Sequence, residues 1–315
     1  MPFEIKNPIE LAEWDNDLHA FDDSSLFHTS AWAAVLAKAY QYRPVYITQY
    51  KHDRLSALLP VMEINSLLTG SRGVSLPFTD CCKAGSESKR DLRKLISFST
   101  GYARAQKWRY LELRQDTPLP IEAAPRRLYK RHILRLDRST DALQGKFRKS
   151  TVRNIKRALR SEIRVDVFHD RKSMREFYRL NCLTRKRHGL PPQPWYFFEA
   201  LLQKIIEPRR GDIFLAFLNE KPIGGSVFLT YRHKAFYKYG ASDFEYAHHR
   251  TNNLLMWEAI KHFSRAGYQA IDFGRTEIDN HGLCQFKRGW GTDEDLLYYY
   301  VFDTQSAKFL PETFS

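Results

Sequence analysis

Cysteine is scarce in this chain, and long apolar runs are missing. The 315 residues contain four cysteines, Cys81, Cys82, Cys182 and Cys284, and no two of them form a CxxC pair. This spacing is not that of a zinc site or of a disulfide framework, so we expect reduced thiols and no metal. The apolar segments are far shorter than the roughly 20 residues that cross a bilayer, and we expect no membrane-spanning helix.

Signals for export and for common cofactor folds are also missing. The first residues, MPFEIKNPIELAEWD, are acidic and polar where a secretory signal has a positive start and an apolar stretch. We therefore expect a cytoplasmic protein and leave open its contact with the inner face of the membrane. No HExxH, Walker A, GxSxG or dinucleotide fingerprint occurs, so we expect no tightly bound cofactor. No helix-turn-helix, zinc-finger or RRM pattern is present either, and DNA is not an expected partner.

Acidic residues are fewer than basic ones. The chain contains 36 Asp and Glu and 50 Lys and Arg, which gives a net charge of +14. Most of the excess positive charge lies between Arg126 and Arg164, a segment that contains fourteen Lys and Arg but only three acidic residues. Phosphates of nucleic acid, of anionic lipid or of a pyrophosphate-linked substrate would fit this charge. Helical spacing within this stretch predicts one amphipathic helix. Its basic face would hold Lys146, Lys149, Arg153, Lys156 and Arg160, and its buried stripe Leu143, Phe147, Ile155 and Leu159.

The length predicts two domains, because single cores usually stop growing below this size. Pro118, Pro120 and Pro125 interrupt regular structure and indicate a boundary near residue 137. We expect domains at 1–137 and 138–315, with the last strand and the tail packing back on the first domain. The pattern of the first half indicates an α/β unit with helices at 24–39 and 89–106 and strands at 45–49, 55–64 and 110–114.

The second half repeats the alternation of helices and strands. Three strands at 213–218, 223–231 and 234–239 are expected to form a meander. An amphipathic helix follows, with Thr251 or Asn252 as its N-cap and Gly267 as its stop. A strand at 270–273, a loop at 274–295 and a last strand at 296–302 complete the prediction. This order is typical of an acyltransferase domain of the GNAT type.

Four short motifs carry a more specific signal: Ser75–Asp80 (SLPFTD), the loop Arg187–Pro194, Asp272–Arg275 (DFGR) and Phe286–Gly291 (FKRGWG). Together they resemble the FemAB-like branch of the GNAT superfamily, known from peptidoglycan bridge formation and from envelope polysaccharide gene clusters. The resemblance covers most of the chain. It implies an α/β fold with two GNAT-like domains, each a mixed, mostly antiparallel sheet flanked by helices. It also implies acyl or aminoacyl transfer to an amine of an anionic envelope precursor, from acyl-CoA or aminoacyl-tRNA.

The resemblance assigns catalytic roles to Phe286 and Lys287, which would lie near the transferred acyl group. Aminolysis of an ester builds negative charge on the carbonyl oxygen, and a fixed cation there is worth a few kcal/mol. Asp272 and Glu277 would orient reacting groups. The alternative for Asp272 is a carboxylate that ends a strand before a glycine turn. A protein kinase is excluded, because no glycine-rich loop, HRD or APE element accompanies the DFG tripeptide.

Cations near the end of a predicted helix are the candidate substrate-binding residues. Arg185, Arg187 and His188 have the chemistry to hold a phosphate, or to offset a helix C-terminal dipole. Asp80, Tyr239 and Arg275 complete the expected substrate site.

Donor binding is expected at Arg250, Asn252 and Asn253. GNAT enzymes that use acyl-CoA hold its pyrophosphate on a glycine-rich turn before the central helix, but 246–253 contains no glycine. This difference disfavours acyl-CoA and leaves room for aminoacyl-tRNA, with the basic helix as a tRNA contact.

Two alternatives stay open at this point. One is an acyl-CoA-dependent N-acyltransferase that acts on an amino sugar of an exopolysaccharide pathway. The other is a basic, non-catalytic module that binds tRNA or a phosphate-bearing lipid. Binding driven by charge alone would weaken steeply as ionic strength rises, and a shaped substrate site would keep part of its affinity.

Overall fold

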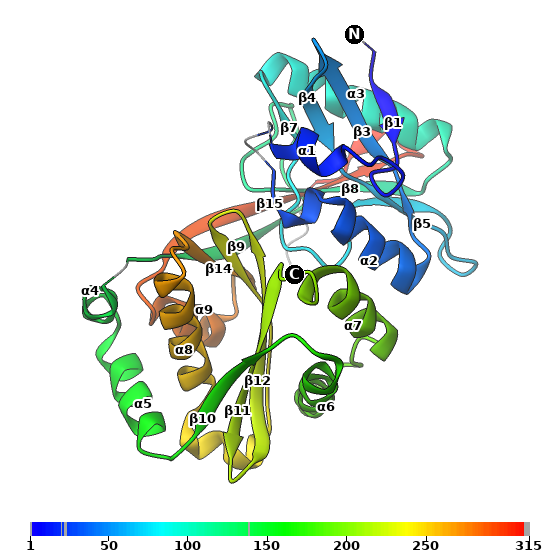
Figure 1. Ribbon diagram of the computed structural model, residues 1–315. Helices are drawn as coiled ribbons and strands as arrows, with labels where there is room; N and C mark the ends of the chain where they lie inside the picture. The colour runs from blue at the N-terminus through cyan, green and yellow to red at the C-terminus, as the bar shows by residue number, and fades with distance from the viewer. Residues whose placement is uncertain (1, 20, 22–23, 138, 312–315) are drawn as a thin grey trace. The chain divides into compact units, whose positions relative to one another are not determined.

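The computed structural model describes residues 2–19, 21, 24–137 and 139–311. The chain forms two compact units (Figure 1). The first unit contains Met1–Lys130 and Leu296–Ser315, and the second contains Arg131–Asp295. Arg138, with which the second domain was expected to begin, lies outside the described residues.

The first unit contains two sheets. One has the antiparallel order β1-β3-β4-β7, and the strands of the other follow the order β15-β8-β6-β5-β2, in which β6 and β8 are parallel. The helical segments are α1 (Trp14–His19), η1 (Leu26–His28), α2 (Ser30–Tyr40) and α3 (Lys89–Ala105). The strands are β1 (Glu4–Lys6), β2 (Arg43–Pro44), β3 (Tyr46–Lys51), β4 (Arg54–Leu59), β5 (Met62–Ile64), β6 (Arg72–Ser75), β7 (Gly85–Ser86), β8 (Tyr110–Gln115), β15 (Asp293–Asp303) and β16 (Lys308–Phe309).

The second unit is built on strands in the order β10-β11-β12-β13-β14, with β9 next to β14. Neighbouring strands from β10 to β13 are antiparallel, and β13 and β14 are parallel. The strands are β9 (Arg127–Arg135), β10 (Arg164–Phe168), β11 (Gly211–Leu218), β12 (Lys221–Tyr231), β13 (Lys234–Ser242) and β14 (Ala270–Glu277). The helical segments are α4 (Thr140–Gly145), α5 (Lys149–Leu159), α6 (Arg171–Arg187), α7 (Trp195–Leu201), η2 (Leu202–Ile206), η3 (Phe244–His249), α8 (Thr251–Arg265) and α9 (His281–Arg288).

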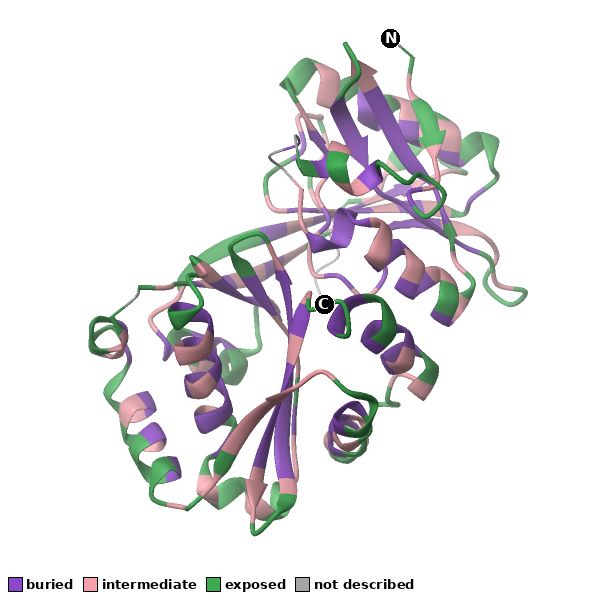
Figure 2. Cartoon of the chain, in the orientation of Figure 1, coloured by how far each residue is buried: buried purple, intermediate pink, exposed green. Residues whose placement is uncertain are grey.

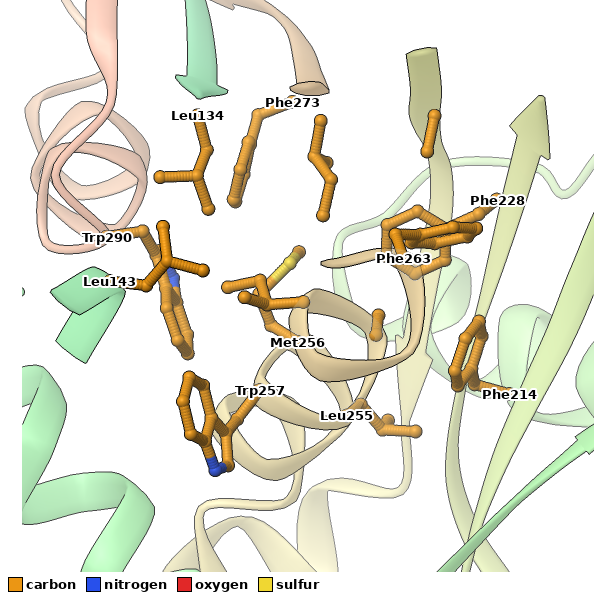
Figure 3. Packing of buried hydrophobic residues seen from close by; sticks show 14 of the residues in the cluster. Leu134, Leu143, Phe214, Phe228, Leu255, Met256, Trp257, Phe263, Phe273 and Trp290 are labelled. Carbon is orange, nitrogen blue, oxygen red and sulfur yellow. The ribbon is translucent and has the colours of Figure 1, made fainter. Parts of the chain in front are cut away.

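Helices cover both faces of this sheet: α6 and α7 lie on one side, and α5 and α8 on the other (Figure 1). Ile213–Ala216 of β11 is buried throughout, because an inner strand between two helical layers has no solvated face. Phe263 of α8 packs against Phe214 and Phe228 of the sheet, and Leu255 and Met256 of the same helix belong to the same buried cluster (Figure 3). The mixed, mostly antiparallel sheets flanked by helices that the sequence predicts are confirmed.

Three local predictions were wrong. The stripe from Leu143 to Leu159 is split between α4 and α5, and Leu159 is 55% exposed instead of buried. Helix α8 has Arg250 as its N-cap, in a left-handed conformation at φ 60°, instead of Thr251 or Asn252. The segment expected as a loop after Gly274 contains the helix α9.

Surface helices of the second unit are amphipathic, with buried and exposed residues on the same helix (Figure 2). No helix in the part of the chain that the structure describes combines the length and apolar character that crossing a membrane requires.

Candidate functional site

Strands β13 and β14 are paired over a short distance only. Their register joins Lys234–Phe236 to Ala270–Asp272, although β13 continues to Ser242 and β14 to Glu277. Beyond Phe236 and Asp272, no further pair joins them among the described residues. The sheet of the second unit is therefore open between the later halves of these two strands.

Aromatic side chains follow the last paired residues of both strands. The rings of Tyr237 and Phe273 have their centroids 6.1 Å apart in an edge-on arrangement. Burial raises the pKa of Tyr237 to about 12, so its hydroxyl stays protonated at neutral pH. A Cβ on Gly240 would lie 1.8 Å from this hydroxyl, and only a glycine leaves room for it there.

Lys287 lies on α9, whose first turn is capped by Asn280 through a bond from the Leu283 N–H. Only 3% of Lys287 is exposed. Its Nζ donates to the carbonyl oxygen of Gly274 at 2.8 Å and to that of Arg275 at 3.0 Å. The ammonium group is thus fixed at the separated end of β14, because buried cations are stable only where acceptors surround them.

The other residues of the FKRGWG motif hold α9 in place. Phe286 is half-buried, and its ring centroid lies 6.2 Å from that of Trp290, which is fully buried. A Cβ on Gly289 would lie 2.5 Å from Thr151 Oγ1. Gly291 has a φ of +69°, and a Cβ there would lie 2.9 Å from the Lys146 carbonyl oxygen. Close packing against the segment before and within α5 therefore explains both glycines.

Asp272 is engaged with its own unit. Its Oδ2 accepts from Arg131 Nε at 2.8 Å and Nη2 at 2.6 Å, and its Oδ1 accepts from the Gly274 N–H at 2.8 Å. The carboxylate thus fixes the part of β14 around Gly274, whose carbonyl oxygen accepts from Lys287. Glu277 is exposed at the end of β14, and Arg275 is half-buried.

His132, on β9, is a buried residue of this region that no sequence motif singles out. Burial lowers the pKa of its imidazole, and the nearby charge of Lys287 lowers it further. Glu294 opposes this effect, with Oε2 at 3.2 Å from His132 Nε2. Sequence reasoning missed Arg131 for the same reason, since it too belongs to no recognisable motif.

The candidate phosphate and donor residues gather around the end of β13. Thr184 of α6 bonds Ser242 through its hydroxyl, which donates to the Ser242 carbonyl at 3.1 Å and accepts from its N–H at 3.0 Å. Asn252 donates to Ser242 Oγ at 3.3 Å. The end of α6 and the start of α8 are therefore held at the same strand end. Asn253 is half-buried in the first turn of α8, and Arg250 is exposed at its N-cap.

The cations at the end of α6 have partners of their own. Arg185 donates from Nε and Nη2 to the Pro191 carbonyl, both at 3.2 Å. The Arg187 guanidinium lies 4.9 Å from the centroid of the exposed Phe244 ring, and its Nη2 lies 3.1 Å from His188 Nε2. This arrangement orders the Arg187–Pro194 loop and leaves Arg187 and His188 exposed.

Two further candidates are placed by aromatic residues. Tyr239 of β13 is half-buried, with its ring centroid 5.4 Å from that of Phe198. Asp80 belongs to the first unit, where its backbone carbonyl accepts from the Tyr299 hydroxyl at 2.5 Å.

Within the described residues, no group of three or more His, Cys, Asp or Glu side chains is arranged to hold a metal ion.

Comparisons with known proteins give a matching domain model, sequence relatives and a shared fold. A sequence model described as an acetyltransferase (GNAT) domain matches residues 145–288. Lipid II:glycine glycyltransferase of Staphylococcus haemolyticus is 34% identical over 104 residues, which are 30% of this chain and 24% of that protein. The protein of the same name from Staphylococcus epidermidis is 20% identical over 275 residues, which are 66% of this chain and 62% of that protein.

The chain thus spans less than two thirds of the length of these curated relatives. A crystal structure of FemX superposes with a TM-score of 0.71 and 14% identity, covering 94% of this chain and 96% of that chain. At this identity the superposition establishes a shared fold. Residues 145–288 therefore match a GNAT acetyltransferase domain, and the chain is similar in sequence to lipid II:glycine glycyltransferases and in fold to FemX.

Proposed function

We propose that this chain transfers an aminoacyl group to an amine of an anionic peptidoglycan precursor. The observation that carries the proposal is the opening between β13 and β14 of the GNAT domain, with the buried ammonium of Lys287 fixed at its edge. The relatives named lipid II:glycine glycyltransferase support this choice of reaction over acylation of an exopolysaccharide sugar.

The chemistry is direct aminolysis. The acceptor amine attacks the carbonyl carbon of the activated aminoacyl ester, and negative charge develops on the carbonyl oxygen. Lys287 supplies positive charge next to this oxyanion, and Phe286 borders the acyl group on the same helix. The ester C–O bond then breaks and an amide forms, while the proton lost by the amine balances the one taken up by the departing ribose oxygen, so that the tRNA leaves with a free hydroxyl. No covalent enzyme intermediate is needed, since the donor is already activated.

The donor turn favours an aminoacyl ester over acyl-CoA. A pyrophosphate is held best by backbone N–H groups that it can approach closely, and glycine permits that approach. Here the short helix η3 and the bulky Arg250 precede α8. Arg185 and Arg187, near the end of β13, are the proposed contacts to the phosphates of the acceptor, because guanidinium groups bind phosphate in a bidentate manner.

A transfer assay tests the proposal. Purified protein is given mixed aminoacyl-tRNAs or a panel of acyl-CoA esters, each with nucleotide-linked and lipid-linked precursors, and products are identified by mass. We expect product from charged tRNA. Product from a CoA ester alone would replace the donor assignment and make the chain an acyl-CoA-dependent N-acyltransferase. No product from any donor and acceptor pair would contradict the proposed function.

A further inference from the structure

Helix α5 presents cations on the face opposite its buried side. Thr151, Ile155 and Ala158 are buried, and they pack α5 onto the second unit. Successive residues of a helix are rotated by about 100°, which places the basic positions on the opposite side. These exposed residues are Lys149, Arg153, Lys156, Arg157 and Arg160, here called the α5 cation row.

The α5 cation row lacks carboxylate partners. Among the described residues, none of its five side chains forms an ion pair with an Asp or Glu. The helix itself contains no acidic residue. Two exposed arginines elsewhere in the second unit do have such partners, since Arg164 is paired with Glu220 and Arg288 with Glu294. The positive charge of α5 is therefore available to an external anion.

Apolar side chains lie beside the cations. A shallow surface groove of about 600 Å³ is lined by the α5 cation row together with Val152 and Ser161. Leu159 is 55% exposed, and helical rotation places it on the same flank as Val152. The row extends over about 17 Å, at about 1.5 Å per residue.

We propose that the α5 cation row docks the protein on the surface of an anionic lipid bilayer. A straight row of cations fits a plane of lipid phosphates, and each Lys or Arg near such a surface adds to the attraction. Leu159 and Val152 would lie at the level of the headgroups, beside the aliphatic stems of the basic side chains. Because the main apolar face of α5 is already buried in the protein, docking is peripheral and does not insert the helix.

An RNA backbone is the competing polyanion, and α5 fits it less well. Proteins that bind single-stranded or looped RNA usually add aromatic side chains on which bases stack. Helix α5 has none, and an exposed leucine beside the cations has no role in phosphate binding. The lipid surface therefore accounts for both the charge and the apolar flank.

This inference rests on the proposed function and specifies its acceptor. A protein that docks on anionic lipid meets a lipid-linked precursor in the same plane, whereas a soluble nucleotide-linked precursor requires no such surface. The lipid-linked class is the acceptor that we assign.

Vesicle binding tests the docking surface directly. The full chain is titrated with phosphatidylcholine vesicles, with or without about 30% phosphatidylglycerol, at about 0.05 M and about 0.5 M salt. The test variant replaces four members of the α5 cation row: Arg153→Gln, Lys156→Gln, Arg157→Gln and, at the C-cap, Arg160→Gln. A matched control replaces four exposed cations of α3 or its end, which changes the net charge equally: Lys89→Gln, Arg90→Gln, Arg104→Gln and Lys107→Gln. Thermal unfolding verifies that each variant is folded.

We expect salt-sensitive binding of the unmodified chain to anionic vesicles. The α5 variant should require at least about tenfold more lipid for half-maximal binding, and the α3 control about the same amount as the unmodified chain. Equal weakening in both variants would mean that net charge alone drives binding, and it would overturn the proposal. An α5 variant that loses binding to an RNA duplex but keeps its binding to vesicles would also overturn the proposal.

The vesicle assay needs neither donor nor acceptor, so its outcome is separate from that of the transfer assay. Vesicle binding through α5 with no transfer product would refute the proposed function alone. Transfer product without α5-dependent vesicle binding would refute the docking surface alone.

Discussion

The ammonium of Lys287 is bound by two backbone carbonyl oxygens, and only 3% of the residue is exposed. Replacing it with Met keeps the aliphatic stem but leaves the carbonyls of Gly274 and Arg275 without their donor. An unsatisfied buried acceptor costs about 1–3 kcal/mol, so the free energy of unfolding should fall by that amount. If the ammonium also stabilises the oxyanion, kcat should fall about 100- to 1,000-fold. Urea unfolding and single-turnover kinetics measure the two effects.

A matched lysine separates these roles. Lys234 is exposed at the start of β13, and Lys234→Met should change neither stability nor turnover. A folded Lys287→Met protein that transfers as fast as the unmodified chain would remove Lys287 from the proposed mechanism. Its contribution would then be limited to fixing the end of β14.

Asp272 provides a second test at the scale of single residues. Its carboxylate is mostly buried and receives two bonds from Arg131. Asp272→Asn leaves the guanidinium without its counter-charge, which costs about 3 kcal/mol for a buried pair. We expect a lower midpoint in urea unfolding. Replacing both residues, with Arg131→Met added, should recover part of the loss, because no unpaired charge then remains.

The exposed Asp279 is the control for this substitution, and Asp279→Asn should leave the midpoint unchanged. An unchanged midpoint for Asp272→Asn, together with a large fall in kcat, would contradict the structural role and support a catalytic one.

Sequence reasoning selected Lys287 and Asp272 but not what they contact. Arg131 and Asp272 are separated by 141 positions, and nothing local in the sequence signals their pairing. The partners of Lys287 are backbone carbonyls, which every residue carries. Side-chain chemistry in a motif is visible in a sequence, whereas the groups that neutralise a buried charge depend on the fold.

At the scale of elements, periodicity located α8 and the basic surface of α5, because both have a clear apolar stripe. Periodicity did not predict the helix α9, which has eight residues and contains Gly282. A helix this short is marginal by itself and depends on packing, so its local signal is weak. Arg250 in a left-handed N-cap was missed for a related reason, since residue preferences favour Ser, Thr, Asp or Asn at that position.

Two glycines near α9 give a prediction at this scale. Gly291 has a positive φ, and its Cβ would approach the Lys146 carbonyl to 2.9 Å. We expect Gly291→Ala to lower the free energy of unfolding by about 1–3 kcal/mol, through strain of the backbone. Gly282 lies within α9, and a Cβ added to it would meet no atom within 4 Å. Gly282→Ala should therefore stabilise the protein by up to about 1 kcal/mol, because alanine favours the helix. Equal effects of the two substitutions in urea unfolding would contradict this account.

For the whole molecule, length and the order of elements predicted the α/β class and the mixed sheets. They did not predict that β13 and β14 separate after three paired residues, because strand register depends on packing between distant segments. The motif resemblance indicated the fold family, and the opening that forms the candidate site became visible only in three dimensions.

The pH dependence of folding is a property of the whole molecule, and the buried His132 should contribute to it near neutral pH. Burial and the charge of Lys287 keep the pKa of His132 below its value in the unfolded chain, about 6.5. Above that pH the imidazole is neutral in both states. As the pH falls below it, the unfolded chain takes up a proton that the folded chain does not, so the free energy of unfolding decreases until the folded pKa is reached.

His132→Gln removes this titration, and the stability difference between about pH 8 and about pH 5.5 should shrink in the variant. The exposed His233 is the control, and His233→Gln should keep the difference seen in the unmodified chain. Urea unfolding at the two pH values measures all three proteins. A His132→Gln protein that loses as much stability on acidification as the unmodified chain would show that the pKa of His132 is the same in the folded and unfolded chain, so that the imidazole is protonated in the folded state at about pH 5.5. The ammonium of Lys287 would then lie beside a second positive charge, a pair that the buried surroundings of β9 and α9 disfavour.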